Sequence, residues 1–356
     1  MNAQAYCGDL LNKKKLFAGL IVLVIVLALL IWGRDRIHFD FGAFRTQLAL
    51  ANWGKIALGV GCIYVAYIFR SVRWALLLRH HKKVSPLSLL GTQVIGFTAV
   101  ALIGRVADPV RPYLVAKKTG LPVSQQLAVY IVERMFDFGS MALIFSTVLL
   151  TSHEALPHPE LLVRIAKSGL LGTAAMAVFT IAVRLSGGVI ADFMEKSLHP
   201  ISATLAHSVG SKIRIFRSGM NTMRSFGDFS SAVVLSLLMW ILITFAYLTT
   251  TQAFVASPQL ASMTIARCML LMAVSMVASG FQLPILGWFT QIGAQVAAMI
   301  SFFGVAPEPA TACGTTLLIV TFLSIVPVGL VWSQFEHLNL RTIAAESGKN
   351  EEEIPV

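Results

Sequence analysis

Long apolar stretches separated by short basic segments dominate this sequence. Crossing a hydrocarbon core of about 30 Å as a helix takes ~20 apolar residues. Runs of about that length fall at residues 16–33, 54–77, 124–150, 163–184, 229–256 and 310–333. The pattern predicts an all-α polytopic membrane protein with six full transmembrane helices.

The first of these runs has the outline of a secretion signal. It follows Lys13, Lys14 and Lys15, and it ends at Trp32-Gly33 before further basic residues. A cleaved signal would end in a pair of small residues, which this segment lacks. We therefore predict a retained first helix.

Two further apolar stretches, 86–118 and 262–304, are interrupted by helix-breaking residues. Broken backbone is tolerated at membrane depth where it is buried in protein or lines a wet cavity. Each stretch can therefore cross the membrane or dip in and return. The breaks lie at Gly104, Pro109 and Pro112 in the first stretch and at Gly280, Pro284 and Gly287 in the second.

The distribution of basic residues favours re-entrant hairpins. If 86–104 crossed fully, the Lys/Arg-free segment 151–162 would be cytoplasmic and the basic segment 184–228 external, which inverts the positive-inside rule. If 86–118 returns to its starting side, both termini are cytoplasmic. The cytoplasmic segments would then hold most of the chain's 28 Lys and Arg, in 13–15, 70–83, 105–118 and 184–228.

A weak internal repeat supports two such hairpins. A Gly, an apolar residue and a nearby Pro precede a long apolar helix at Gly120 and again at Gly304. We predict an inverted-topology repeat, common in transporters, with units at about 85–150 and 262–333. Both units lie in one membrane domain, 1–356, which includes a short tail at 336–356.

The stretch "YIVERMFDFGSM" (130–141) places charges inside an apolar helix. At 100° per residue, Tyr130, Glu133, Arg134 and Asp137 share one face. A charge facing lipid at this depth costs at least ~3 kcal/mol. The stripe must therefore face protein or water, as an ion-pair network or as a lipid headgroup site.

The first hairpin supplies further charges. Asp108 followed by Pro109 is a good helix start, so a half-helix is expected to present free N–H groups there, at membrane depth. Arg105 and Arg111 flank this point, and a guanidinium fork suits a phosphodiester. We expect Arg111 to contact the phosphate; alternatively, both arginines neutralise the neighbouring carboxylates.

Other polar residues are candidates for entry to the site or for its support. Arg70 and Arg73 close the apolar run 54–77, where they either anchor the helix in headgroups or form an entry. The second hairpin offers Gln282 and Gln291 but no charge. It is expected to form a more apolar opposite wall or to serve packing alone.

The segment 187–228 contains an amphipathic pattern. Apolar residues recur every three or four positions between Ile201 and Met223, with basic residues beside them. This predicts a cytoplasmic amphipathic helix, which lies on the inner leaflet or packs on the protein.

Composition agrees with a membrane protein and narrows its chemistry. The 356 residues are 56% apolar and 13% charged, and the net charge is +11. A basic balance suits anionic lipids, and nucleic acid is not expected as a partner because the basic residues flank apolar spans. The cysteines and histidines are scattered without ligand spacing, and no nucleophile or phosphate-binding motif is present. We expect no metal, no cofactor and no catalytic activity.

Four short patterns together resemble the flippase-like family built on the transmembrane region of lysylphosphatidylglycerol synthases. At the hairpin, Ile103, Ala107 and Asp108 stand where that family has Pro, Gly and Glu. The four patterns are Arg73-Trp74, Gly104-Arg105 with Arg111, Glu133-Arg134 with Asp137, and the Gly304 segment.

The resemblance implies a stand-alone membrane half without an aminoacyltransferase domain. It implies a lipid translocator that binds an anionic headgroup, in the bacterial cytoplasmic (inner) membrane. The alternative is a scaffold or accessory subunit for a membrane enzyme that modifies lipids or glycans.

Overall fold

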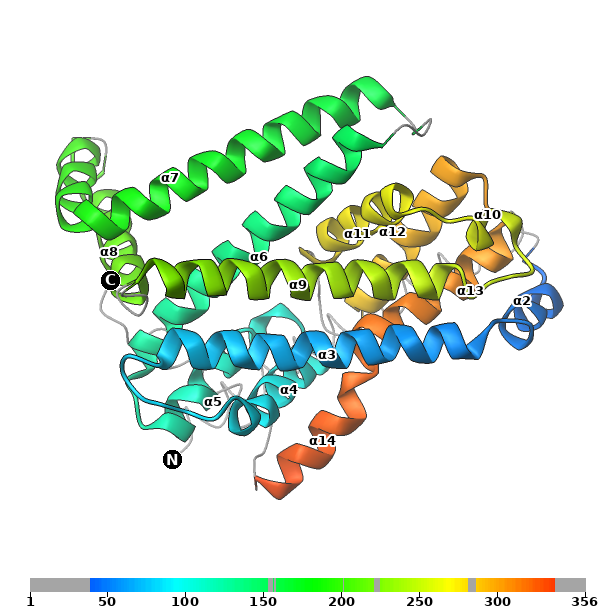
Figure 1. The fold of residues 1–356 in the computed structure, drawn as a ribbon, viewed down its shortest axis with the longest axis horizontal. Helices are drawn as coiled ribbons and strands as arrows, with labels where there is room; N and C mark the ends of the chain where they lie inside the picture. The colour runs from blue at the N-terminus through cyan, green and yellow to red at the C-terminus, as the bar shows by residue number, and fades with distance from the viewer. Residues whose placement is uncertain are drawn as a thin grey trace, which may run out of the picture.

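The computed structural model describes residues 39–152, 156, 158–200, 202–220, 225–280 and 286–336, and these residues form helices and loops without a strand (Figure 1). This confirms the all-α prediction. The predicted first helix 16–33, Gln282 and nearly all of the tail lie outside the described residues.

The described helices match the predicted apolar runs closely. Among the described residues, five segments are long and apolar enough to cross a membrane, and one of them is Pro86–Ile103 in the first broken stretch. α6 is 29 residues and about 43 Å long, enough to cross despite its charges. The elements are α2 (Phe41–Ala49), α3 (Trp53–Leu78), α4 (Pro86–Ile103), α5 (Val110–Thr119), α6 (Val123–Thr151), α7 (Pro159–Leu198), α8 (Ala203–Met220), α9 (Phe226–Thr251), α10 (Pro258–Ala261), α11 (Ile265–Gly280), α12 (Leu286–Phe303), α13 (Pro307–Leu318) and α14 (Ile325–Phe335).

Two long helices, α3 and α9, lie antiparallel along the centre of the molecule (Figure 1). Ser225 and Asp228 form a capping box that starts α9. Gly59 of α3 lets the helices approach closely, because a Cβ there would lie 2.7 Å from Thr250 Oγ1. The largest apolar cluster surrounds this pair and includes residues of α11 and α13.

The first broken stretch forms a hairpin that returns to the end at which it began. α4 ends at Gly104, whose φ of 90° suits glycine, and a short 3-10 turn leads to α5. Lys82 Nζ, before the hairpin, donates to the Thr119 carbonyl at its end, at 2.6 Å. The two ends therefore meet beside the C-terminus of α3, as a re-entrant segment requires.

The second broken stretch, α11 and α12, forms a hairpin from the opposite end of the molecule. Its ends meet where the Arg267 guanidinium lies 5.9 Å from the ring of Phe303. Gln252, just after α9, donates to the Met263 carbonyl, so this hairpin begins near the other end of the central pair. The two hairpins thus enter from opposite ends (Figure 1).

The tips of the two hairpins contact each other. Arg105, at the first tip, donates to the carbonyl and hydroxyl of Ser279 at 3.1 and 2.8 Å. Trp288 Nε1 donates to the Ala101 carbonyl at 3.0 Å. Gly120 and Gly304 both adopt positive φ, 69° and 63°, at the matched helix ends. The inverted-topology repeat, with units at about 85–150 and 262–333, stays a prediction.

The helices α7 and α8 form an arm at one edge of the molecule (Figure 1). α7 continues to Leu198 through a non-helical residue at Ser186, beyond the predicted end at 184. α8 confirms the amphipathic helix. Its Ile213 is buried in an apolar cluster that includes residues of α3 and α6. Of the two predicted placements, this part of the stripe packs on the protein.

The last predicted span, 310–333, is divided by a π-helical turn at Ile319–Leu323. Ser324 N–H donates five residues back, to the Ile319 carbonyl, at 2.7 Å. Pro327 has no N–H for the usual bond to residue 323, which favours a break at this place.

Candidate functional site

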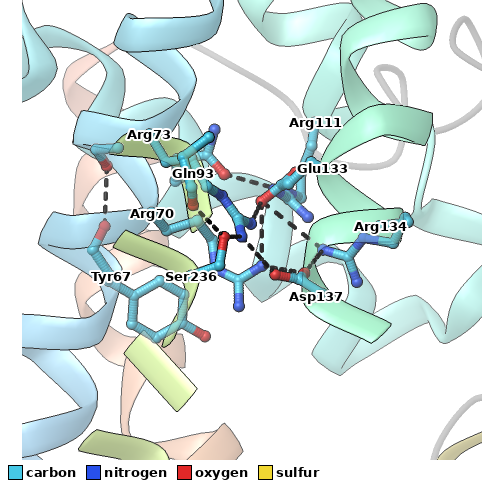
Figure 2. Close-up of polar contacts among 11 residues, drawn as sticks. Tyr67, Arg70, Arg73, Gln93, Arg111, Glu133, Arg134, Asp137 and Ser236 are labelled. Atoms are coloured by element: carbon cyan, nitrogen blue, oxygen red, sulfur yellow. Dashed lines mark hydrogen bonds and ion pairs between the residues drawn. The ribbon is translucent and has the colours of Figure 1, made fainter. Parts of the chain in front are cut away.

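The acidic face of α6 meets the basic end of α3. Glu133 and Asp137 are one helical turn apart, as are Arg70 and Arg73, so each pair faces the other across the interface. Glu133 Oε1 lies 2.8 Å from Arg73 Nη2 and 3.2 Å from Arg70 Nη1. Asp137 Oδ1 lies 2.7 Å from Arg73 Nη1 (Figure 2).

Two more arginines complete this arrangement. Arg111 Nη2, from α5, lies 2.6 Å from Glu133 Oε2. Arg134 Nη2 lies 3.2 Å from Asp137 Oδ2 on the same helix. We call the six residues the charge cluster: Arg70, Arg73, Arg111, Glu133, Arg134 and Asp137.

The charge cluster is buried and electrically unbalanced. Glu133 is 1% exposed and Asp137 is 4% exposed. Four guanidinium groups face two carboxylates, a surplus of two positive charges. Burying unpaired charge costs several kcal/mol, so such a surplus is stable only with access to water or to an anion.

Neutral groups also support the cluster, and the sequence did not identify them. Gln93 Oε1 accepts from Arg111 Nε at 3.0 Å, and Ser236 Oγ accepts from Arg73 at 2.6 Å. The Arg111 guanidinium lies 4.4 Å from the ring of Phe97. Gln93 is an isolated amide in the apolar run 86–103, and this could have marked it as a site residue in the sequence. Ser236 and Phe97 carry no comparable signal.

A cavity of about 200 Å³ opens beside the charge cluster, where the hairpin tips meet. Arg70, Arg105, Asp108 and Arg134 line it on the charged side. The Arg134 side chain is 27% exposed, and its Nε has no hydrogen-bond partner among the described residues. The surplus positive charge therefore has an accessible face.

The predicted site residues divide between the cavity and its support. Arg73 and Arg111 are each 1% exposed and lie behind the cavity wall. The Tyr130 ring lies 5.5 Å from the Arg111 guanidinium and 5.1 Å from that of Arg134. Gln291, from α12, reaches the cavity.

One local expectation was wrong. Asp108 does not cap a half-helix: its backbone is already helical, and its carboxylate lies 3.7 Å from Arg105. Of the two alternatives for Arg70 and Arg73, headgroup anchoring does not hold, because the charge cluster buries both; Arg70 lines the cavity, and Arg73 lies behind it.

The opposite side of the cavity is neutral and polar. Gln291 Nε2 donates to Ser275 Oγ at 2.7 Å, and the Tyr247 hydroxyl lies 3.0 Å from the same atom. Gln295 Nε2 also donates to Ser275, at 2.8 Å. We call Trp240, Tyr247, Ser275 and Gln291 the neutral wall, since all four line the cavity.

The described residues provide no group of three or more His, Cys, Asp or Glu that could hold a metal ion. Arginines facing a small cavity are suited instead to binding a phosphate or another oxyanion, which they can grip with two N–H groups each.

A comparison with protein families identifies the family of this chain. The model of the lysylphosphatidylglycerol synthase TM region matches residues 16–329. The chain belongs to this family. The match covers the described helices from α2 to the first part of α14, up to residue 329, and includes both hairpins and the charge cluster. No curated protein and no solved structure matched the chain.

Proposed function

We propose that this family member binds the phosphate of an anionic lipid between the hairpin tips and carries the lipid headgroup across the membrane. The observation that carries the proposal is the surplus of two positive charges on a cavity at membrane depth. Arg70 lies eight residues from the end of α3, about 12 Å along the helix.

Phosphate is the ligand that best offsets this charge. A phosphodiester carries one negative charge and two free oxygens, which a guanidinium can bind, and Arg134 Nε has no hydrogen-bond partner among the described residues. In the low dielectric of a membrane protein, this attraction is much stronger than in water. The carboxylates of the charge cluster hold the arginines in place before the ligand arrives.

An apolar groove explains how the acyl tails would be accommodated. The groove, of about 740 Å³, lies between α6, α7 and α11. It shares Arg105, Met276 and Ser279 with the cavity, so the two spaces adjoin at the hairpin tips. A lipid could place its phosphate in the cavity while its tails stay in the groove or in the surrounding hydrocarbon.

Reconstitution tests this proposal. The full chain would be placed in phosphatidylcholine liposomes containing fluorescent phosphatidylglycerol, and dithionite would report the lipid that reaches the outer leaflet. We expect translocation above empty liposomes, and a reduction of about tenfold or more in Arg134→Gln. Arg70 and Arg73 still pair with Asp137 in this variant, so the fold should persist.

Arg214→Gln is the matched control. Arg214 also forms ion pairs, with Asp192 and Glu195 at 2.8 Å each, but does not line the cavity. Equal rates in both variants, with the wild type active, would refute the role of the cavity. Saturable phosphatidylglycerol binding without translocation would favour the scaffold function instead.

A further inference from the structure

The neutral wall offers hydrogen-bonding groups that the phosphate does not require. Trp240 lines the cavity, and its indole N–H is buried without a hydrogen-bond partner among the described residues. Gln291 uses its amide nitrogen on Ser275, which leaves its carbonyl oxygen as an acceptor. The Tyr247 hydroxyl donates to Ser275 and accepts from Gln295, so it supports these groups from within the wall.

The wall is held in place by a buried network. Ser275 is 3% exposed and receives both Gln291 and Gln295, and Gln295 is fully buried. Gln295 Nε2 also lies 3.4 Å from the Tyr247 hydroxyl. A network that fixes three polar side chains around one hydroxyl keeps its remaining groups oriented. If these residues served packing alone, apolar side chains would fill the space without the cost of burying polar groups.

The cavity disfavours a cationic headgroup terminus. Among the described lining residues, Asp108 is the single carboxylate, against Arg70, Arg105 and Arg134. Asp108 also already lies near Arg105. An ammonium group would therefore meet net positive charge, whereas hydroxyl groups would meet donors, acceptors and aromatic faces.

The volume sets an upper limit on the headgroup. At about 200 Å³ the cavity is smaller than the ~300–1,000 Å³ of pockets that hold drug-sized ligands. One small polyol fits this scale better than an oligosaccharide does.

We propose that the cavity selects an anionic phospholipid whose phosphate carries a small uncharged polyol, with the phosphate on the arginine side and the hydroxyl groups on the neutral wall. This inference rests on the proposed function and specifies its substrate class. It separates such lipids from aminoacylated and ethanolamine lipids, whose headgroups end in ammonium.

Binding of three short-chain lipids to the purified full chain tests the inference. The probes are dioctanoyl phosphatidylglycerol, which has phosphate and polyol, dioctanoyl phosphatidic acid, which has phosphate alone, and dioctanoyl phosphatidylethanolamine, which has phosphate and ammonium. We expect phosphatidylglycerol to bind about tenfold more tightly than phosphatidylethanolamine. The variants Trp240→Phe and Gln291→Leu each remove one hydrogen-bonding group.

Each variant should weaken phosphatidylglycerol binding about fivefold, the usual effect of one hydrogen bond, and leave phosphatidic acid binding within twofold. A merely structural role would change both lipids alike. Trp53→Phe is the matched control, because Trp53 is 60% exposed at the start of α3.

The possible results separate the two proposals. The polyol assignment would be overturned if the variants lost affinity for both lipids equally or for neither. It would also be overturned if phosphatidylethanolamine bound as tightly as phosphatidylglycerol. Phosphate binding would still stand in these cases. If neither phosphatidic acid nor phosphatidylglycerol binds better than dioctanoyl phosphatidylcholine, the proposed function itself fails.

Discussion

Arg105 joins the tips of the two hairpins through Ser279, with its Nε 3.1 Å from the Ser279 carbonyl oxygen and its Nη2 2.8 Å from the hydroxyl. The contact separates the charged cavity from the apolar groove, because both residues line both spaces. A lipid that moves between the two spaces would pass this contact.

Arg105→Leu should therefore alter transport more than stability. The Arg105 side chain is 42% exposed, so the loss of its hydrogen bonds should cost no more than about 1 kcal/mol of unfolding free energy. We expect a changed rate of lipid translocation in liposomes and a melting temperature close to that of the wild type. A large fall in melting temperature with an unchanged rate would show that the contact is purely structural.

Glu133 and Arg111 should be strongly coupled in stability. Their side chains are each 1% exposed and 2.6 Å apart. Glu133→Leu leaves buried arginines without a partner, at a cost of about 3–5 kcal/mol. The double variant Glu133→Leu/Arg111→Leu should lose less than the sum of the single variants, by about 1 kcal/mol or more. Chemical unfolding in detergent measures the free energy of unfolding of the wild type, the two single variants and the double variant. Strictly additive losses would contradict the coupling.

Arg111→Lys and Arg134→Lys should behave differently. Arg111 uses its fork on Glu133 and Gln93 and packs on aromatic rings, which lysine cannot reproduce. We expect Arg111→Lys to lower the melting temperature. Arg134 is partly exposed to the cavity, so Arg134→Lys should keep the melting temperature and weaken lipid binding. The reverse pattern would assign the phosphate contact to Arg111, as the sequence first suggested.

The re-entrant hairpin predicts the sidedness of two loops. Lys117, near the end of α5, and Thr151, at the end of α6, are exposed at opposite ends of α6. Lys117→Cys should be labelled from the cytoplasm and Thr151→Cys from outside, by a membrane-impermeant maleimide, in a chain with Cys7 replaced. The other cysteines, Cys62, Cys268 and Cys313, are buried. Labelling of both positions from one side would exclude the predicted topology.

The sequence by itself determined the helical membrane architecture and the two hairpins. Helix length and hydropathy follow from local composition, because every backbone group in the membrane must be paired within its own segment. The charges of α6 could be recognised for the same reason, since hydrocarbon penalises each of them wherever the helix packs. Glu133, Arg134 and Asp137 thus stood out without knowledge of any partner.

The tertiary structure alone decided which groups meet. Arg70 and Arg73 had the pattern of headgroup anchors, and only the packing of α3 on α6 buries them against two carboxylates. Arg111 was the strongest candidate for phosphate, yet its neighbours enclose it and leave Arg134 and Arg105 at the cavity. The neutral wall combines α9, α11 and α12, and of its residues the sequence indicated Gln291 alone, because none of them carries a charge. Burial and partner choice depend on contacts distant in sequence, which a local pattern does not encode.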